Sequence, residues 1–493
     1  MALFSQILVN IATAATMARP AINRVRLTTP RMAALGGPEV TVLGGGFGGL
    51  YTALRLVSLD WSGGPRPRVT LVDRHERFAF SPMLYELATG TATCWEVAPL
   101  YEDLLAGTGI DFVRGEVRGL DEAEQVVRVV APPTANGEAR AERLLPYDQC
   151  VLAFGSQPTL DRVEGAAEYA QPFYSTDDAL AVKRKVRQLR EDAADSRSAL
   201  RVCVVGGGYI GAELAANLAS SLPSSEVLLT LVHRADALLT SATDHSRDVA
   251  VKKLADAGVD VILNTEVELV TDSSIRLVPV GGGGGGGGSE AAAAAAGEPE
   301  AAPTTRAAAA ARAVQSATTS GYDLPVDLTL WTAGSEPSSI VQELQLPLDA
   351  SGRIAVEPTL KVVGKPGLYA LGDASAVTDA NGARSPSTAQ AAMQQADYTA
   401  WNVRASLRGE GNGLPFRYLP LGEMLSLGSD AASISALGQL VKLSGPLGSI
   451  GRRAVYAARM PTPRQAAKVG LSWAVDAAFG ALRKAAVPPS QKK

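Results

Sequence analysis

The chain has 493 residues, of which 46% are hydrophobic and 19% charged, and its formal net charge at pH 7 is −4. This composition excludes a wholly disordered chain, and the length predicts two or three domains. Three cysteines without a close pair, and only three histidines, exclude a disulfide scaffold, a redox dithiol and a four-cysteine zinc site. Because no apolar run reaches the roughly 18 to 20 residues that span a bilayer, we expect a soluble or peripherally attached protein without bound metal or nucleic acid.

The beginning of the chain predicts a targeting segment. Residues 1–38 carry four arginines among Ala, Leu, Ser and Thr, and they contain no acidic residue. This composition is typical of an organelle transit peptide. We therefore expect a transit peptide at residues 1–35, with a basic, disordered start as the alternative.

A strand, a glycine turn and a helix follow in EVTVLGGGFGGLYTALRL. In such a GxGxxG pattern the first glycine allows a tight turn, the second lets a pyrophosphate approach the backbone, and the third lets helix and strand pack closely. The next strand, RPRVTLVD, ends in an acid that can accept hydrogen bonds from an adenosine ribose. The predicted cofactor-binding residues are Gly44, Gly46, Phe47, Gly48, Gly49 and Asp73.

The same pattern returns in RVCVVGGGYIGAELAANL, followed by the strand EVLLTLVHR. The predicted nucleotide-binding residues here are Gly206, Gly208, Tyr209, Gly211, His233 and Arg234. His233 and Arg234 stand where an acid ended the earlier strand, and an acid would repel a 2′-phosphate. We therefore expect NADPH to be accepted; the alternative is that both are solvated surface residues that do not discriminate between NADPH and NADH.

Residues 281–320 are of low complexity, with a run of glycines, a run of alanines and an Ala/Thr/Arg-rich stretch. They cannot bury enough apolar area to offset their ordering entropy, so we expect a flexible surface insertion. The flanking sequences SSIRLVPV and DLTLWTAG look like strands, which predicts that the insertion lies at a hairpin tip. The polar stretch 131–143 predicts a smaller tip of the same kind.

A third signal is GLYALGDAS, in which a short apolar strand ends in Gly372 and Asp373 ahead of a helix expected near Ser387. In flavoproteins with two dinucleotide sites, such an Asp bonds the ribityl–phosphate region of the flavin. Two glycine loops with different strand ends indicate two dinucleotides, one held and one exchanged. The expected fold class is therefore α/β, with tandem Rossmann-like domains built on parallel sheets. Cys150 and Cys203 lie in probable core strands, so inert burial is expected for both.

The carboxyl-terminal tail predicts a surface for lipid. Residues 440–493 carry ten Lys or Arg against one acidic residue. Apolar residues fall at helical spacing within residues 468–486, and Trp473 could sit at a lipid–water boundary; the spaced residues are Leu471, Val475, Phe479 and Leu482. This pattern favours an interfacial amphipathic helix. The alternative is a helix packed on its own body or on a homodimer partner.

From about residue 39 to 480 the chain resembles the type II NAD(P)H dehydrogenases, the single-subunit, non-proton-pumping NAD(P)H:quinone oxidoreductases. The blocks that carry the resemblance are GGGFGGLYTALRL, FAFSPMLYEL, GGGYIGAELA, LWTAG, YALGDAS and TAQAAMQQADYTAWN. FSPMLYEL, LGEMLSLG and the tail look closest to the C-type plant and algal branch. That likeness implies bound FAD, NADPH or NADH as co-substrate, and a prenylquinone acceptor: plastoquinone, demethylphylloquinone or ubiquinone. It also suggests a role in phylloquinone (vitamin K1) biosynthesis.

The resemblance also implies roles for individual residues. The AQxAxQ pattern that is a quinone-site signature of this family falls on Ala389, Gln390, Ala392 and Gln394. Two glutamines four apart share one helical face, their amides can donate to quinone carbonyls, and the small alanines let a flat ring approach. A packed helix with two ordinary glutamines is the alternative. Glu213 matches a family glutamate near the nicotinamide–flavin junction, or is an ordinary helix-start carboxylate.

These expectations define an architecture and its rivals. We expect an FAD-binding domain at 36–165 and 340–420, an NAD(P)H-binding domain at 166–339, and a membrane-facing region at 421–493. The expected location is the chloroplast, at a plastoglobule or thylakoid surface, with the mitochondrion as an alternative. The rival functions are a soluble flavin reductase with a protein acceptor and a non-catalytic lipid-droplet scaffold.

Overall fold

The computed structural model describes residues 37–132, 142–196, 199–280, 321–411, 413–428, 431–436 and 440–486. The predicted transit peptide at 1–35 and the predicted insertion at 281–320 lie outside the described residues. In the part of the chain that is described, no helix is both long and apolar enough to cross a bilayer.

The first glycine loop belongs to a five-stranded parallel sheet with the order β18-β7-β1-β2-β3. Its strands are β1 (Glu39–Leu43), β2 (Arg68–Asp73), β3 (Ile110–Arg114), β7 (Gln149–Leu152) and β18 (Leu368–Ala370). The middle strands are nearly continuous runs of buried apolar residues, as expected for a parallel sheet covered on both faces. The last strand comes from far along the chain, so this sheet is assembled from two separate segments.

The second glycine loop belongs to another parallel sheet, with the order β12-β11-β10-β16-β9. Its strands are β9 (Ala170–Pro172), β10 (Leu200–Val205), β11 (Val227–Val232), β12 (Asp260–Ile262) and β16 (Leu328–Trp331). Between the two sheets the chain passes through β8 (Ser156–Pro158) and returns through β17 (Ser335–Pro337), and these two strands pair antiparallel. The exact domain boundaries at 165/166 and 339/340 stay a prediction.

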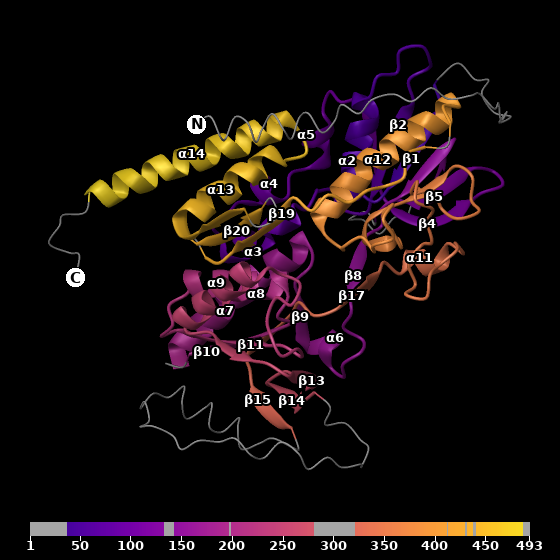
Figure 1. The fold of residues 1–493 in the computed structure, drawn as a ribbon. Coiled ribbons are helices and arrows are strands. Elements are labelled where there is room, and N and C mark those ends of the chain that lie inside the picture. Colours follow the sequence, from indigo (N-terminus) through magenta and orange to yellow (C-terminus); the bar gives the residue numbers. More distant parts are fainter. Residues whose placement is uncertain are drawn as a thin grey trace.

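Helices pack around both sheets and link them (Figure 1). In the first unit, α2 (Phe47–Ser58) packs along α12 (Ala389–Arg408). The other long helices are α7 (Thr176–Ser196), α8 (Tyr209–Ser221) and α9 (Asp244–Asp256). The short α3 (Leu84–Thr89) follows the 3-10 turn Ser81–Met83 and contacts both α7 and α8, so it joins the two units. The remaining short helices are α4 (Cys94–Val97), α5 (Tyr101–Leu105), α6 (Ala166–Tyr169), α11 (Ile340–Glu343) and the 3-10 turn Gly372–Ala374.

Antiparallel sheets extend each unit. In the first, β4 (Glu116–Asp121), β5 (Val126–Val130) and β6 (Glu142–Pro146) form a meander, and the segment 131–143 connects its last two strands as predicted. In the second, the sheet order is β13-β14-β15, and its strands are β13 (Thr265–Val270), β14 (Ser274–Pro279) and β15 (Tyr322–Pro325).

One predicted pairing is wrong. The strand in DLTLWTAG is not the hairpin partner of SSIRLVPV, because it forms β16 beside β10 in the parallel sheet. The partner of β14 is β15, which lies just before β16 in the chain. The segment 281–320 does lie between these two paired strands.

The carboxyl-terminal region folds back onto both units. It contains β19 (Gly422–Ser426), β20 (Ala432–Ala436), β21 (Val441–Ser444), α13 (Gly445–Ala458) and α14 (Pro463–Ala486). The three strands form an antiparallel sheet, and α13 packs on β20 and on α14 (Figure 1).

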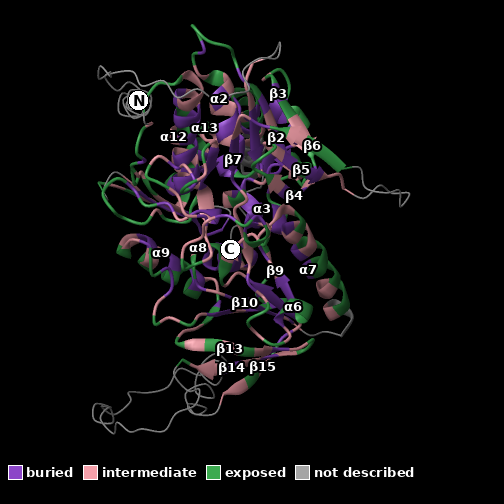
Figure 2. Ribbon diagram, turned by 90° about the vertical axis from the view of Figure 1, so that its right-hand side faces the viewer, coloured by how far each residue is buried: buried purple, intermediate pink, exposed green. Residues whose placement is uncertain are grey.

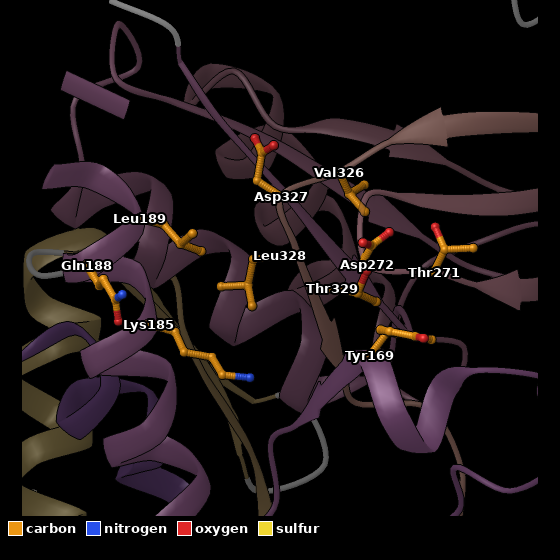
Figure 3. Close-up of a pocket in the computed structure, with 10 residues that line it drawn as sticks. All are labelled: Tyr169, Lys185, Gln188, Leu189, Thr271, Asp272, Val326, Asp327, Leu328 and Thr329. Atoms are coloured by element: carbon orange, nitrogen blue, oxygen red, sulfur yellow. The ribbon is translucent and has the colours of Figure 1, made fainter. Parts of the chain in front are cut away.

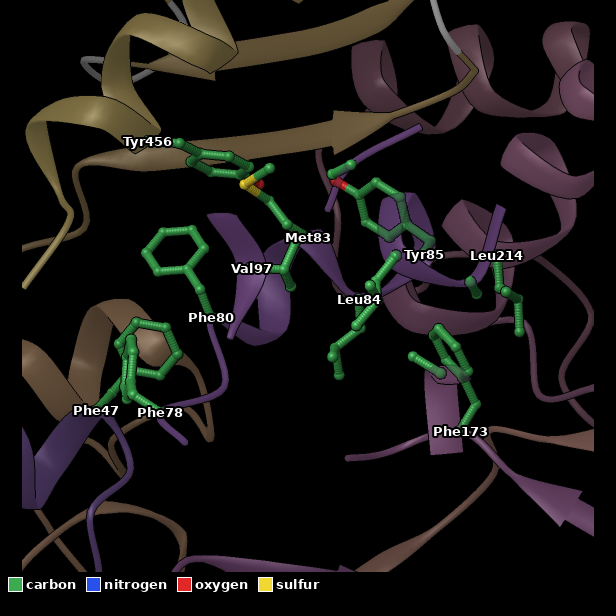
Figure 4. Packing of buried hydrophobic residues seen from close by; sticks show 14 of the residues in the cluster. Phe47, Phe78, Phe80, Met83, Leu84, Tyr85, Val97, Phe173, Leu214 and Tyr456 are labelled. Carbon is green, nitrogen blue, oxygen red and sulfur yellow. The ribbon is translucent and has the colours of Figure 1, made fainter. Parts of the chain in front are cut away.

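The largest hydrophobic cluster contains residues of both units and of the carboxyl-terminal region. Figure 2 shows the buried residues in the interior of both units. Figure 4 shows its aromatic part, in which Phe47 at the start of α2 packs edge-on against Phe78 and Phe80, and Phe80 packs against Tyr456 of α13. Cys150 and Cys203 are fully buried in their strands, and burial raises the pKa of both thiols, which confirms the prediction of inert cysteines.

Candidate functional site

The first glycine loop has the geometry of a phosphate-binding turn. Gly44 has a φ of +96°, a conformation that side chains disfavour. A Cβ on Gly49 would lie 1.8 Å from the carbonyl oxygen of Gly44, whereas a Cβ on Gly46 would meet nothing within 4 Å. Gly46 is the N-cap of α2 and offers no side-chain cap, so the amide groups of the first turn face open space. The loop therefore fits a dinucleotide pyrophosphate.

The second loop repeats this geometry. Gly206 has a φ of +112°, and a Cβ on Gly211 would lie 1.8 Å from the Gly206 carbonyl oxygen. Gly208 is again an N-cap without a side-chain cap, at the start of α8, and space above it is open.

The residues that end the second strand of each unit make equivalent contacts. The Gly45 N–H donates to Oδ2 of Asp73 at 2.6 Å, and the Gly207 N–H donates to Nδ1 of His233 at 3.0 Å. An imidazole that accepts at Nδ1 is uncharged, and burial and the neighbouring Arg234 both lower the pKa of His233. Where the first unit has a carboxylate, the second unit has a neutral ring followed by an exposed cation.

The first glycine loop lines a cavity of about 1620 Å³, and so does the start of α8, directly after the second loop, through Tyr209, Ile210 and Glu213. A pocket for a single drug-sized ligand has roughly 300–1,000 Å³, so there is space for more than one group. The cavity lies at the carboxyl ends of the parallel strands, which is where α/β folds bind ligands. Most of the predicted site residues line it: Gly44, Gly46, Phe47, Gly48, Asp73, Tyr209, Glu213, Gly372, Asp373, Ala389, Gln390 and Ala392. The other predicted residues are not among its lining residues: Gly49, Gly206, Gly208, Gly211, His233, Arg234 and Gln394.

Asp373 lies beside β8, one of the two strands through which the chain passes between the two units. Its Oδ2 accepts from the Ser156 hydroxyl at 3.0 Å, and that hydroxyl also contacts the Tyr174 hydroxyl. Burial raises the pKa of Asp373, in part offset by Ser156. The turn itself is held by Gln395, whose Oε1 accepts from the Gly372 N–H at 2.7 Å. The sequence pattern did not single out Ser156, Tyr174 or Gln395.

Glu213 is buried on α8 and faces the same cavity. Its Oε1 accepts from the Ser426 N–H of β19 at 2.8 Å. Burial raises the pKa of Glu213 to about 8, although the Ser426 N–H and Arg452 both oppose this shift. A carboxyl group of this kind carries a proton at neutral pH, and Oε2 is the oxygen left to hold it.

A buried ion pair lies close to Glu213. The Nη2 of Arg452 on α13 donates to Oε1 of Glu86 on α3 at 2.5 Å, and Nη1 donates to the Tyr85 hydroxyl at 3.1 Å. The guanidinium also lies 5.2 Å from the ring centroid of Tyr456. These residues come from distant parts of the chain, and no sequence spacing pointed to them.

The two glutamines of the AQxAxQ pattern are engaged with the protein backbone. Gln394 makes a pair of bonds with Leu419, donating to its carbonyl at 2.8 Å and accepting from its N–H at 2.9 Å. Gln390 donates to the Gly422 carbonyl at 3.1 Å and accepts from the Leu421 N–H at 3.0 Å and the Tyr418 hydroxyl at 2.9 Å. Both amides thus hold residues 418–422, and Gln390 also lines the cavity together with Ala389 and Ala392.

A second, smaller cavity of about 230 Å³ lies between α7 and the β13–β15 sheet (Figure 3). It is lined by Lys185 of α7, Asp272 and residues 326–329 at the amino end of β16. Ligands of α/β sheets bind at the carboxyl ends of the strands, and neither glycine loop lines this cavity. Within the described ranges, no three His, Cys, Asp or Glu side chains are placed to hold a metal ion.

The helices α13 and α14 expose apolar side chains. The exposed fractions are 68% for Leu447, 67% for Ile450, 67% for Leu471 and 43% for Val475. In contrast, Trp473 packs against the main cluster, with the Arg453 guanidinium 5.8 Å from its ring centroid. Leu471 and Val475 are exposed as predicted, whereas Trp473 faces the body of the protein; the side chains of Phe479 and Leu482 lie outside the described residues.

Comparisons with known proteins agree with this geometry. A family model described as pyridine nucleotide-disulphide oxidoreductase matches residues 38–396. The chain is 37% identical to demethylphylloquinone reductase NdbB of Synechocystis, over 88% of this chain and 95% of that protein. It is also 37% identical to the chloroplastic/mitochondrial alternative NAD(P)H-ubiquinone oxidoreductase C1 of Arabidopsis thaliana, over 90% of this chain and 82% of that protein.

A solved structure, NDH2 from Plasmodium falciparum in complex with NADH, matches with a TM-score of 0.70 and 16% identity, covering 88% of this chain and 97% of that chain. This likeness supports the two-unit α/β fold. The chain belongs to the pyridine nucleotide-disulphide oxidoreductase family and, within it, to the type II NAD(P)H dehydrogenases.

Proposed function

We propose that the protein is an FAD-dependent NAD(P)H:quinone oxidoreductase. The observation that carries this proposal is that two glycine loops have matching geometry, and that one cavity is lined both by the first loop and by the start of α8, which directly follows the second. When bound, a flavin takes a hydride with its electron pair from the reduced nicotinamide, which is oxidised, and then passes two electrons to a quinone, which takes up two protons.

The residues of the first unit fit FAD. The uncapped amide groups after Gly46 would hold the pyrophosphate, and Asp73 would accept from the adenosine ribose. Asp373, which already accepts from one hydroxyl, would accept from the ribityl chain. The second unit would hold the nicotinamide nucleotide, with Gly208, Tyr209 and Gly211 at its phosphates.

We propose that NADPH is accepted as well as NADH. The support is the neutral His233 ring followed by Arg234, because neither side chain repels a 2′-phosphate and the guanidinium attracts it.

The acceptor proposed is a prenylquinone. It would bind where the small side chains of Ala389 and Ala392 line the cavity. The two relatives named above act on demethylphylloquinone and ubiquinone, respectively, according to their names. A role in phylloquinone biosynthesis follows as a proposal from the first of these. Each of the two amides donates one N–H to a backbone carbonyl and has one N–H left, but only Gln390 lines the cavity, so Gln390 is the one proposed to donate to a quinone carbonyl.

A long-tailed quinone lies in a membrane or a lipid droplet, and the enzyme must reach it. We propose that the exposed apolar side chains of α13 and α14, with the basic residues of the same region, contact that surface. A plastid location is proposed from the arginines and the lack of acidic residues at the start of the chain, and from the plant relative, which is named as a chloroplastic/mitochondrial enzyme. The homodimer stays a prediction.

The test is an anaerobic titration of the purified protein followed by visible absorption. We expect a bound flavin spectrum that bleaches on addition of NADPH or NADH and recovers on addition of a quinone. A folded protein that is colourless and does not take up FAD would contradict the proposal. Recovery with a ferredoxin-type protein but not with quinones would favour the soluble flavin reductase.

A further inference from the structure

Residues 418–426, here called the crossing segment, connect the two nucleotide-binding units. The segment follows the first unit's α12 and includes β19, and its residues Tyr418, Leu421, Glu423 and Met424 line the large cavity. It is therefore both a wall of the cavity and a link between α12 of the first unit and the second unit.

One end of the crossing segment is fixed to the first unit. Gln390 and Gln394, one turn apart on α12, make five hydrogen bonds to residues 418–422, four of them to backbone groups. A side-chain amide that satisfies backbone donors and acceptors in this way replaces the pairing that a strand would supply. The segment therefore cannot move without α12.

The other end is fixed to the second unit through Glu423. Its Oε2 accepts from the hydroxyl of Tyr209 at 2.5 Å, and its Oε1 accepts from the N–H and the hydroxyl of Thr243, at 2.9 Å for the N–H. Tyr209 is the first residue of α8, directly after the second glycine loop, and Thr243 is the N-cap of α9. Ser426 adds further contacts to α8: its N–H donates to Glu213, and Asn217 donates to its carbonyl at 3.2 Å and also bonds with its hydroxyl.

Glu423 stays ionised in this position. Burial raises its pKa, but the hydrogen bonds from Thr243, Tyr209 and Ser246 outweigh burial, and the pKa is lowered overall. Hydrogen bonds to a carboxylate are roughly twice as strong as neutral ones. The contact is also placed near the amino ends of two helices, where a negative charge is favourable.

We propose that Glu423 is a positioning residue that fixes the second glycine loop, and with it the nicotinamide, against the flavin site of the first unit. This rests on the proposed function, in which the hydride passes between the two sites. Because a misplacement of about 1 Å can slow a reaction by about 100-fold, the contact acts on the rate of hydride transfer rather than on nucleotide affinity.

The experiment compares Glu423→Ala, Tyr209→Phe and the control Glu410→Ala. Glu410 is also a carboxylate near α12, but it pairs with Arg404 and Arg408 of the same unit. Two readouts are needed. One is the rate of flavin bleaching by saturating NADPH in anaerobic stopped flow, together with the nucleotide dissociation constant. The other is hydrogen exchange of residues 206–215 and 418–426 in the protein without nucleotide.

We expect Glu423→Ala to slow bleaching by about 10- to 100-fold, to change the dissociation constant by less than about three-fold, and to speed hydrogen exchange in both segments. Tyr209→Phe removes the hydroxyl that donates to Glu423 and keeps the aromatic ring. It should slow bleaching and speed exchange in the same way but to a smaller extent. If Glu423→Ala does not fold, the Tyr209→Phe result alone tests the proposal. Oxidation of dithionite-reduced flavin by quinone should stay near the wild-type rate.

Wild-type bleaching rates in both variants, with wild-type exchange at 206–215, would overturn the proposal. A loss of affinity equal to the loss of rate would overturn it too. If the wild-type protein is not bleached by either nucleotide, the proposed function fails, and the exchange data alone then decide whether Glu423 fixes the loop.

Discussion

Glu213 combines burial, a backbone hydrogen bond and an oxygen that is free to carry a proton, and it faces the cavity that we propose as the quinone site. Because burial raises its pKa to about 8, the group is protonated below that pH and loses the proton above it. We therefore predict that the rate of quinone reduction falls as the pH rises through about 8. The measurement is the pH profile of kcat with a short-tailed quinone.

Glu213→Gln is the matching variant. The glutamine Oε1 can still accept from the Ser426 N–H, so the fold should be kept, but the amide carries no acidic proton. We expect kcat to fall by about 100-fold, within the usual range for the loss of a general acid, and the alkaline limb to disappear. A limb with an unchanged midpoint in this variant would show that another group titrates.

His233 gives a second prediction at this scale. His233→Asp would place a carboxylate where the first unit has Asp73, and the Gly207 N–H could donate to it as the Gly45 N–H does to Asp73. Repulsion of the 2′-phosphate should lower kcat/KM for NADPH by about ten-fold or more, with little change for NADH. Leu228→Asp, on the exposed side of the same strand, is the control. An unchanged nucleotide ratio in His233→Asp would contradict the proposed NADPH use.

The role of a single residue could be predicted from the sequence when the residue acts on its neighbours in the chain, and not when its partner is distant in sequence. Gly46 and Gly49 were predictable because each acts within one turn of strand, loop and helix. Gln395 was not, because it holds the Gly372 turn through a contact that only the packing of α12 creates. The same holds for the Gln390 and Gln394 amides, whose partners at 418–422 could not be seen from the helix pattern alone.

At the scale of elements, α14 presents Leu471 and Val475 to solvent while Val469 and Gln465 are buried against the body. Each apolar side chain of this size gains about 1.5–3 kcal/mol when it leaves water. We therefore predict that Leu471→Glu with Val475→Glu weakens binding to anionic lipid vesicles by at least about ten-fold. Cosedimentation with vesicles measures this, and activity with short-tailed quinones should be unchanged.

The control places the same two glutamates elsewhere. Leu228 and Val251 are also exposed, at 55% and 47%, but they lie on β11 and α9 of the second unit. Leu228→Glu with Val251→Glu adds equal charge and should leave vesicle binding near the wild-type level. Equal losses in both double variants would mean that net charge, and not the apolar face of α14, governs the interaction.

Units whose contacting strand and helix are neighbours in the sequence were predicted well. The strand–loop–helix units at β1–α2 and β10–α8 follow from the glycine pattern and the apolar runs, as does the start of α12 near Ser387. The partner of β14 was assigned wrongly because both β15 and β16 follow the insertion, and the apolar content of β16 indicated a strand without indicating its sheet. Pairing across a long insertion is fixed by tertiary packing and not by strand propensity.

At the scale of the whole molecule, three segments that the sequence separates meet at one point. α3 of the first unit, α8 of the second and α13 of the carboxyl-terminal region bring Glu86, Glu213 and Arg452 together in the interior. No periodicity predicts such a meeting, because each residue is an ordinary charged residue in its own helix. The pair of Glu86 and Arg452 is a buried polar link between the carboxyl-terminal region and the first unit, in which both side chains are more than nine-tenths buried.

We predict that Arg452→Ala destabilises the protein by about 3–5 kcal/mol, because it leaves the Glu86 carboxylate buried without its partner. Glu86→Gln combined with Arg452→Met removes both charges and should recover most of that loss. Arg190→Ala, which breaks the half-exposed pair with Glu226, should cost less than about 1 kcal/mol. Urea denaturation of the protein with its flavin bound measures all three. If Arg452→Ala costs no more than Arg190→Ala, the buried pair does not hold the carboxyl-terminal region in place, and the apolar contacts of Tyr456 with Phe80 must do so instead.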